Sequence, residues 1–186
     1  IASVSREFGI GIVSPNGKQA MIDHAAALKN GSAICVVDPG QGLPLFDQAE
    51  LTDLLTGADL YIVNDYEWEL TMKTTGLSRE AVLERVETLI VTGGEKGSTV
   101  FSSSGTLEIP VVQADQVVDP TGCGDAFRAG LLYGLDHGFD LEASARLGSV
   151  MGSFLVEHHG TQTDAFGQED VHARHRRAFG GDPGAA

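Results

Sequence analysis

Residues 119–125, Asp-Pro-Thr-Gly-Cys-Gly-Asp, combine two carboxylates with two closely spaced glycines just before an apolar stretch with helical spacing. The glycines let the backbone approach a ligand, and amides at the start of a helix bind phosphate or a developing oxyanion. Asp125 falls in the first turn of that helix, where the macrodipole favours a charged carboxylate. It can take a proton from a substrate hydroxyl while the amides of Gly122, Cys123 and Gly124 hold the anionic group.

The alternative interpretation of this segment is structural, because an Asp beside a glycine turn often only caps a helix. A lone Gly-x-Gly-Asp would favour that explanation, but a cap has no need of the preceding Asp-Pro-Thr. The sequence contains no Gly-x-x-x-x-Gly-Lys-Ser/Thr and no Gly-x-Gly-x-x-Gly after its first strand. These absences argue against P-loop and Rossmann nucleotide sites.

Short apolar runs alternate with helical patterns before this segment. The expected strands are residues 10–13, 33–37, 60–63 and 89–91, and the expected helices are 21–28, 48–55, 66–75 and 79–87, with a loop at 38–42. Continuously apolar strands between helices are typical of a parallel sheet buried on both faces. We therefore expect an α/β fold with three layers (α/β/α) and a mainly parallel central sheet.

The pattern then changes to a hairpin and a helical region. Residues 98–102 and 106–109 flank a Ser-Ser-Gly turn and predict a hairpin, and helices are expected over 126–137, 141–159 and 169–179. No linker or repeat divides the sequence, so a single domain over residues 1–186 is predicted.

The composition is acidic, with 12 basic and 26 acidic residues and a net charge of −14. Such a surface repels nucleic acid and anionic membranes, so neither is an expected partner. The sequence has no apolar run long enough for a transmembrane helix, and its first residues do not resemble a signal peptide. The one basic cluster, residues 172–177, is expected to be a solvated face of the last helix.

The two cysteines, Cys35 and Cys123, lie far apart and match no zinc-ligand spacing. Reduced thiols fit a cytoplasmic setting. The helix N-terminus favours a thiolate at Cys123, but inertness is the expectation for this thiol.

The nine residues from Asp119 to Phe127 are similar to the C-terminal signature of the ribokinase-like (PfkB) carbohydrate and nucleoside kinases, commonly Asp-Thr-Thr-Gly-Ala-Gly-Asp-Ala-Phe. Pro120 and the following Arg128-Ala-Gly130 look most like the bacterial adenosine-kinase-like branch. Gly148-Ser149 and Gly160-Thr-Gln162 are compatible with it. The resemblance extends over nearly the whole chain, and it implies that Asp125 is a catalytic base beside an anion hole.

The resemblance also gives roles to residues that would otherwise be interpreted as a cap and a turn. Asn64-Asp-Tyr-Glu67 matches the family motif Asn-x-x-Glu, which organises Mg²⁺, its waters and the nucleotide phosphates, with Glu67 acting through water. The segment from Thr92 through Gly94 to Gly97 resembles the one that lines the ATP groove.

A monovalent-cation site is the third implication of the resemblance. It places Asp119 and Thr121 as ligands of K⁺, together with carbonyls near Leu155 and Gly160, and oxygen ligands suit a hard cation. The alternative is that Asp119 simply caps its own loop.

Family members are longer, and their N-terminal part supplies a lid and most acceptor contacts. The resemblance therefore implies the C-terminal part of a kinase, without the lid through which relatives often form homodimers. The expected activity is ATP- and Mg²⁺-dependent phosphorylation of a primary hydroxyl of a nucleoside, with adenosine preferred. A sugar kinase of the ribose or fructose type is the alternative, followed by a hydroxymethyl-pyrimidine kinase. A non-catalytic nucleotide-binding module is the main hypothesis of another class, and a hydrolase ranks last.

Overall fold

The computed structural model describes residues 8–184, which form two compact units. The first unit contains the residues up to 93 together with residues 99–107, and the second contains residues 94–98 and those from 108 onward. Each unit has its own cluster of buried apolar side chains.

The strands of the first unit follow one another across the sheet in chain order. They are β1 (Ile10–Val13), β2 (Ile34–Val37), β3 (Ala58–Asn64) and β4 (Val86–Thr92), all parallel, and the hairpin strands β5 (Ser98–Ser102) and β6 (Gly105–Ile109) complete the sheet. Ile10 lies opposite Ile34, and Ala58 lies opposite Val86. The predicted α/β fold with a mainly parallel sheet is thus confirmed.

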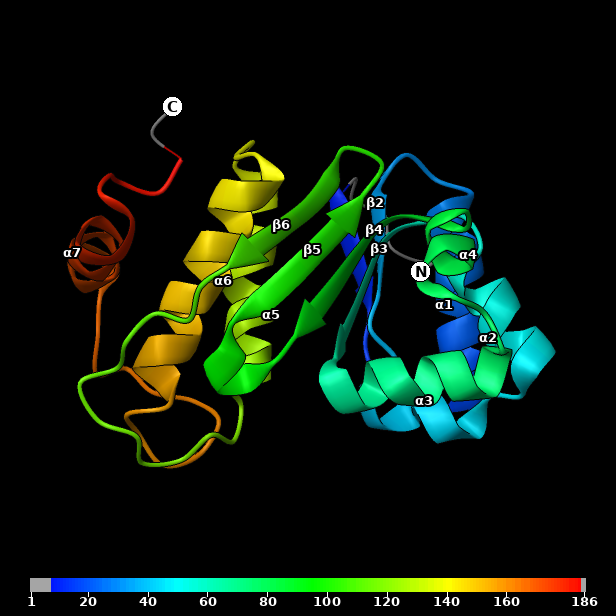
Figure 1. The fold of residues 1–186 in the computed structure, drawn as a ribbon, viewed down its shortest axis with the longest axis horizontal. Coiled ribbons are helices and arrows are strands. Elements are labelled where there is room, and N and C mark those ends of the chain that lie inside the picture. The colour runs from blue at the N-terminus through cyan, green and yellow to red at the C-terminus, as the bar shows by residue number, and fades with distance from the viewer. Residues whose placement is uncertain (1–7, 185–186) are drawn as a thin grey trace. The chain divides into compact units, whose positions relative to one another are not determined.

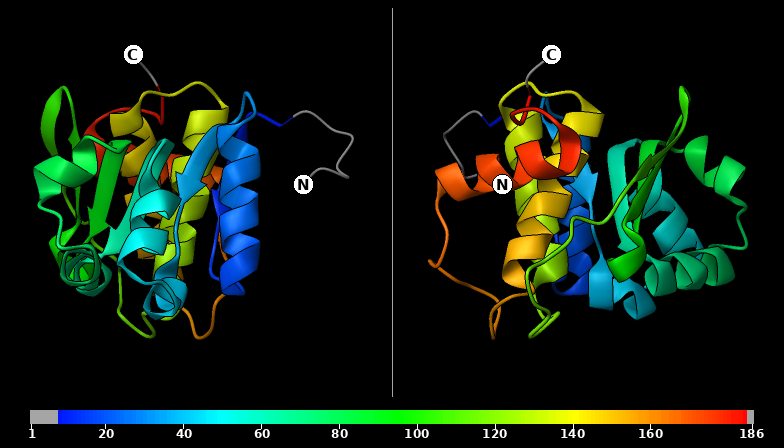
Figure 2. Two further views of the ribbon diagram at one scale, coloured as in Figure 1. Left: turned by 90° about the vertical axis from the view of Figure 1, so that its right-hand side faces the viewer. Right: turned by 60° about the vertical axis from the view of Figure 1, so that its left-hand side comes forward.

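Helices connect the parallel strands. They are α1 (Lys18–Lys29), the 3-10 helix η1 (Gly40–Leu45), α2 (Gln48–Leu55), α3 (Asp65–Thr75) and α4 (Arg79–Leu83). Because the strands are added in one direction and such crossovers are right-handed, these helices lie on one face of β1–β4 (Figures 1 and 2). The core between them includes the fully buried Met21, Leu51, Tyr61 and Leu89.

Several predicted boundaries in this unit are wrong. The helix predicted over 79–87 ends at Leu83, and β4 begins at Val86. Val86 is buried and pairs with Ala58, whereas Glu87 is exposed, which is the alternation of a strand. The loop predicted at 38–42 is partly helical, because η1 begins at Gly40.

The second unit consists mainly of α5 (Cys123–Asp136), α6 (Leu141–Leu155) and α7 (Gln168–Phe179), with the 3-10 turn η2 (Gly94–Lys96). The backbones of α5 and α6 are in close contact, since a Cβ on Gly130 would lie 2.8 Å from the Cα of Gly148. The helix predicted to reach residue 159 ends at Leu155. The Val156 carbonyl that follows it instead accepts the amides of Val118 and Asp119.

The prediction of a solvated basic face over residues 172–177 is wrong for two residues. Val171, Arg174 and His175 are all buried on α7. Their i, i+3, i+4 spacing puts them on one side of the helix, and α7 lies beside α6 (Figure 1). Only Arg176 and Arg177 remain exposed among the basic residues of the cluster.

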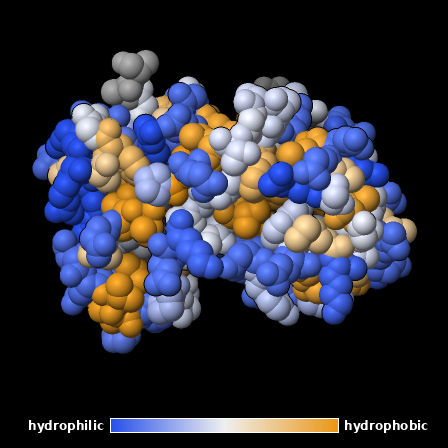
Figure 3. Space-filling view, viewed as in Figure 1, coloured by the Kyte–Doolittle hydropathy of each residue, from blue (hydrophilic) through white to orange (hydrophobic). Residues whose placement is uncertain are grey.

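Hydrophilic side chains cover most of the surface drawn in Figure 3, with hydrophobic groups between them. Within residues 8–184, no helix combines the length and apolar character needed to cross a membrane.

Candidate active site

The predicted catalytic loop leads directly into α5. Gly122 is the N-cap residue of that helix, so Cys123, Gly124 and Asp125 form its first turn, three residues earlier than the predicted start. No side chain caps the helix, and Asp125 is exposed. Asp125 is therefore not the N-cap residue, although its carboxylate lies in the first turn, where it can still stabilise the start of the helix.

Gly122 is the residue that permits this turn. Its φ of +83° lies in the left-handed region that side-chain-bearing residues avoid. A Cβ there would also lie 2.9 Å from a methyl carbon of Leu155 and 3.0 Å from the Cα of Thr161. The loop thus approaches the residues that follow α6 more closely than any side chain at position 122 would allow.

The amides of this loop divide into two sets. The amide of Thr121 donates to the Asp119 carboxylate at 2.9 Å, and the amide of Cys123 donates to the Pro120 carbonyl at 3.2 Å. The amides of Gly124 and Asp125, which follow in the first helical turn, have no intrahelical acceptor. They lie at the positive end of α5, beside the Asp125 carboxylate, and their predicted role in anion binding stays a prediction.

Asp119 caps its own loop and ties it to a second one. Its Oδ1 accepts the Thr121 amide, and its Oδ2 accepts the Gly160 amide at 3.1 Å. Hydrogen bonds from the Thr121 hydroxyl, the Gly160 amide and the Thr121 amide lower the pKa of Asp119 to about 2. The capping alternative is therefore confirmed for Asp119, and its role as a K⁺ ligand stays a prediction.

Asn64, Glu67 and Thr92 lie together at the carboxyl edge of the first unit's parallel strands. Asn64 ends β3 and Thr92 ends β4, and the two residues are paired in register. Asn64 and Glu67 form a capping box at the start of α3, in which each side chain accepts the other's amide, at 2.8 Å and 2.9 Å. Ligands bind at this edge in open α/β sheets.

The capping role of Asn64 and Glu67 is confirmed, and their role near Mg²⁺ stays a prediction. The residues from 8 to 184 contain no group of three or more His, Cys, Asp or Glu side chains able to hold a metal. Two oxygen-bearing side chains still fit Mg²⁺, because this ion keeps several waters and relies on substrate phosphates.

Gly94 begins η2 in the second unit and Gly97 follows it, with φ values of +58° and +84°. A Cβ on Gly97 would collide with the Ile109 carbonyl, whereas one on Gly94 would meet nothing within 4 Å. Gly97 is thus required by the approach of its own backbone to residue 109. The predicted contacts of both glycines with a nucleotide stay predictions.

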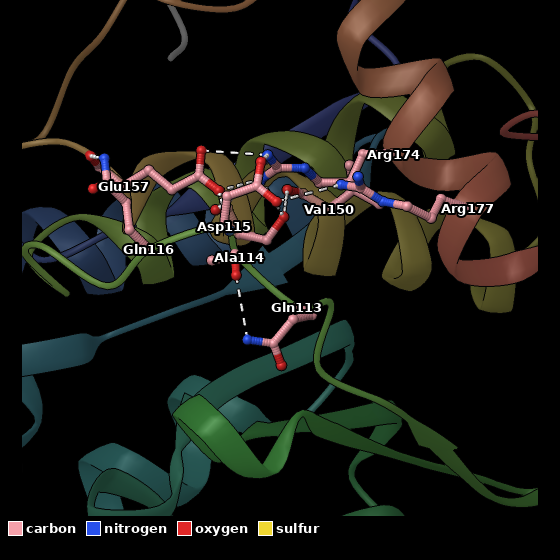
Figure 4. Close-up of polar contacts among 9 residues, drawn as sticks. Gln113, Ala114, Asp115, Gln116, Val150, Glu157, Arg174 and Arg177 are labelled. Carbon is pink, nitrogen blue, oxygen red and sulfur yellow. Dashed lines mark hydrogen bonds and ion pairs between the residues drawn. The ribbon is translucent and has the colours of Figure 1, made fainter.

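The sequence interpretation missed Arg174, whose side chain reaches the segment before the catalytic loop (Figure 4). The sequence predicts Arg174 as part of a solvated helix face, because the macrodipole favours basic residues in the last turn of a helix. The sequence feature that indicates the burial of Arg174 is its position three residues after Val171, which places both residues on the buried side of α7.

Comparisons with known proteins identify relatives of this chain. A family model described as pfkB family carbohydrate kinase matches residues 4–166. The nucleoside kinase of Methanocaldococcus jannaschii is 37% identical over 134 residues, which are 72% of this chain and 44% of that protein.

Two solved structures of Burkholderia thailandensis nucleoside kinase are also similar. The complex with inosine has a TM-score of 0.94 at 45% identity and covers 97% of this chain and 59% of its own. The complex with ADP-inosine has a TM-score of 0.94 at 44% identity, over 98% and 57% of the respective chains. The chain thus spans about half the length of these relatives. The family model covers most of the chain, and the protein belongs to the pfkB family of carbohydrate kinases.

Proposed function

We propose that this chain carries the phosphoryl-transfer part of an ATP-dependent nucleoside kinase. The observation that carries the proposal is the exposed Asp125 carboxylate beside the amides of Gly124 and Asp125 at the uncapped start of α5. The nucleoside class is supported by the relatives, which include nucleoside kinases and structures with inosine and ADP-inosine.

The chemistry follows from this placement of acid and amides. Asp125 accepts the proton of a primary hydroxyl on the acceptor, whose oxygen forms a bond to the γ-phosphorus of ATP. The bond from that phosphorus to the oxygen bridging to the β-phosphate breaks, and ADP leaves with the electron pair. The amides of Gly124 and Asp125 stabilise the charge on the transferring group.

Two cations belong to the proposal. Mg²⁺, when bound, offsets charge on the phosphates, and Asn64 and Glu67 would orient its waters from the carboxyl end of β3. Asp119 and Thr121, with the carbonyls near Leu155 and Gly160, offer only oxygen atoms, which fits K⁺. Activity that rises when K⁺ replaces Na⁺ supports this second site.

Adenosine is the acceptor that we propose, and ribose or fructose is the alternative. The test incubates the protein that carries this chain with Mg²⁺, ATP and adenosine, inosine, ribose or fructose, and follows ADP release. We expect nucleosides to be phosphorylated faster than free sugars. Faster phosphorylation of a free sugar would show that the acceptor is a sugar and not a nucleoside. ATP binding measured by calorimetry without any turnover would favour a non-catalytic nucleotide-binding module.

Asp125→Asn tests the base directly. We expect kcat to fall about 10²- to 10⁴-fold, which is the usual contribution of a positioned base. Asp136→Asn is the matched control, because Asp136 is exposed at the other end of the same helix. Near-full activity of the Asp125→Asn protein would remove Asp125 from its role.

A further inference from the structure

Arg174 carries a permanent charge in the middle of α7, yet it is 5% exposed. Its guanidinium stacks over Phe154, with Cζ 3.6 Å from the ring centroid. One of its nitrogens donates to the carbonyl of Ser153 at 3.0 Å and to the Ser153 hydroxyl at 3.2 Å. The side chain is thus fixed against the last turn of α6.

The same guanidinium bridges two carboxylates (Figure 4). It contacts Glu157 at 2.9 Å and Asp115 at 3.3 Å. The Glu157 side chain is 11% exposed, whereas that of Asp115 is 72% exposed. Removing Arg174 would leave the Glu157 carboxylate buried without its counter-ion, which is a costly arrangement.

Glu157 and its neighbour also hold the segment that enters the catalytic loop. The Asp115 amide donates to Glu157 Oε1 at 2.7 Å. The amides of Val118 and Asp119 both donate to the Val156 carbonyl, at 2.8 and 3.1 Å. Residues 115–119 therefore run along the residues that follow α6, and Arg174 contacts both sides of this junction.

We propose that Arg174 is a positioning residue of the kinase site. It fixes the end of α6 against residues 115–119, and so determines where Asp119 and the amides of Gly124 and Asp125 lie. Arg174 does not touch the reacting atoms. This inference rests on the proposed function, and it adds a residue from α7 to the part of the site that the loop before α5 forms.

The first test measures amide hydrogen exchange over residues 115–125 in the protein that carries this chain. Arg174→Met removes the charge at similar length, and we expect exchange there to rise about tenfold or more. Arg174→Lys keeps the charge but lacks the planar guanidinium that contacts several acceptors at once, so we expect an intermediate rise in the exchange rate. Arg176→Met is the matched control, because Arg176 is exposed on the same helix and pairs with Asp182. In the Arg176→Met protein, amide exchange over residues 115–125 should equal that of wild type.

The second test measures kinetics at a temperature where circular dichroism shows each variant fully folded. We expect Arg174→Met to lower kcat about 10- to 100-fold through misplacement of the loop. The nucleoside KM should change less than about threefold, because the altered amides act on the phosphoryl group. If Arg174→Met does not fold, Glu157→Gln provides the same two readouts with a smaller change of shape.

A folded Arg174→Met protein with wild-type kcat and wild-type exchange at 115–125 would overturn the inference and leave Arg174 a role in stability only. Failure of the proposed function looks different. In that case the wild-type protein phosphorylates no nucleoside, while the exchange experiment still reports whether Arg174 holds the loop.

Discussion

Asp119 Oδ2 accepts a hydrogen bond at 3.1 Å from the amide of Gly160, 41 residues later in the chain. Its other oxygen accepts the amide of Thr121. Asp119 therefore joins the turn before α5 to the turn after α6. These two hydrogen bonds depend on the carboxylate being charged, because a protonated oxygen accepts amide hydrogen bonds less well.

The stability of the protein should depend on Asp119 at acid pH. Its folded pKa of about 2 lies below the ordinary value of 3.8, so the folded state binds fewer protons than the unfolded state between these values. The stabilisation is fully present above the ordinary pKa and is lost as the pH falls toward 2. The melting temperature of the Asp119→Asn protein should therefore fall less between pH 5 and pH 2 than that of the wild-type protein. The melting temperature of the Asp136→Asn protein, the control, should fall as much as that of wild type. Equal losses in all three proteins would show that Asp119 is not responsible.

Gly122→Ala should destabilise the protein through both backbone strain and steric overlap. A left-handed conformation costs an Ala roughly 1–2 kcal/mol, and overpacking against Leu155 and Thr161 typically adds about 1–3 kcal/mol. Gly138→Ala is the control, since its φ of +77° is similar but a Cβ there meets nothing within 4 Å. Urea unfolding should show a larger loss for Gly122→Ala, and equal losses would mean that the loop can move away from residue 161.

Asn64 should have a role beyond its helix cap. Asn64→Ala should cost about 0.5–2 kcal/mol of unfolding free energy, and so should Asp47→Ala, which breaks a capping box of the same type at α2. Kinase activity measured over a range of Mg²⁺ concentrations should fall for Asn64→Ala and not for Asp47→Ala. Asn64→Ser can still cap the helix, so full activity of that protein at every Mg²⁺ concentration would reduce Asn64 to a structural role.

The sequence was sufficient to predict the parallel strands and the glycine turn that leads into α5. Apolar runs bounded by turns report burial directly, and Gly122 and Gly124 are residue types that a backbone anion site requires. The boundary between α4 and β4 could not be predicted, because pairing of Val86 with Ala58 overrides the local helical pattern. The burial of Arg174 was missed for a similar reason. Its partners Ser153, Glu157 and Asp115 lie in distant segments that only the fold brings together.

The Cys123 thiol should be unreactive at neutral pH although it begins a helix. Burial raises its pKa, and the nearby Asp119 charge raises it further, so these effects outweigh the helix N-terminus. Alkylation by iodoacetamide can be followed residue by residue with mass spectrometry. The alkylation rate of Cys123 should increase only at pH values above the pKa of an ordinary thiol. In denaturant, Cys123 and the buried Cys35 should react alike. Rapid alkylation of Cys123 in the folded protein at pH 7 would mean that the helix N-terminus dominates and that this thiol is an accessible thiolate.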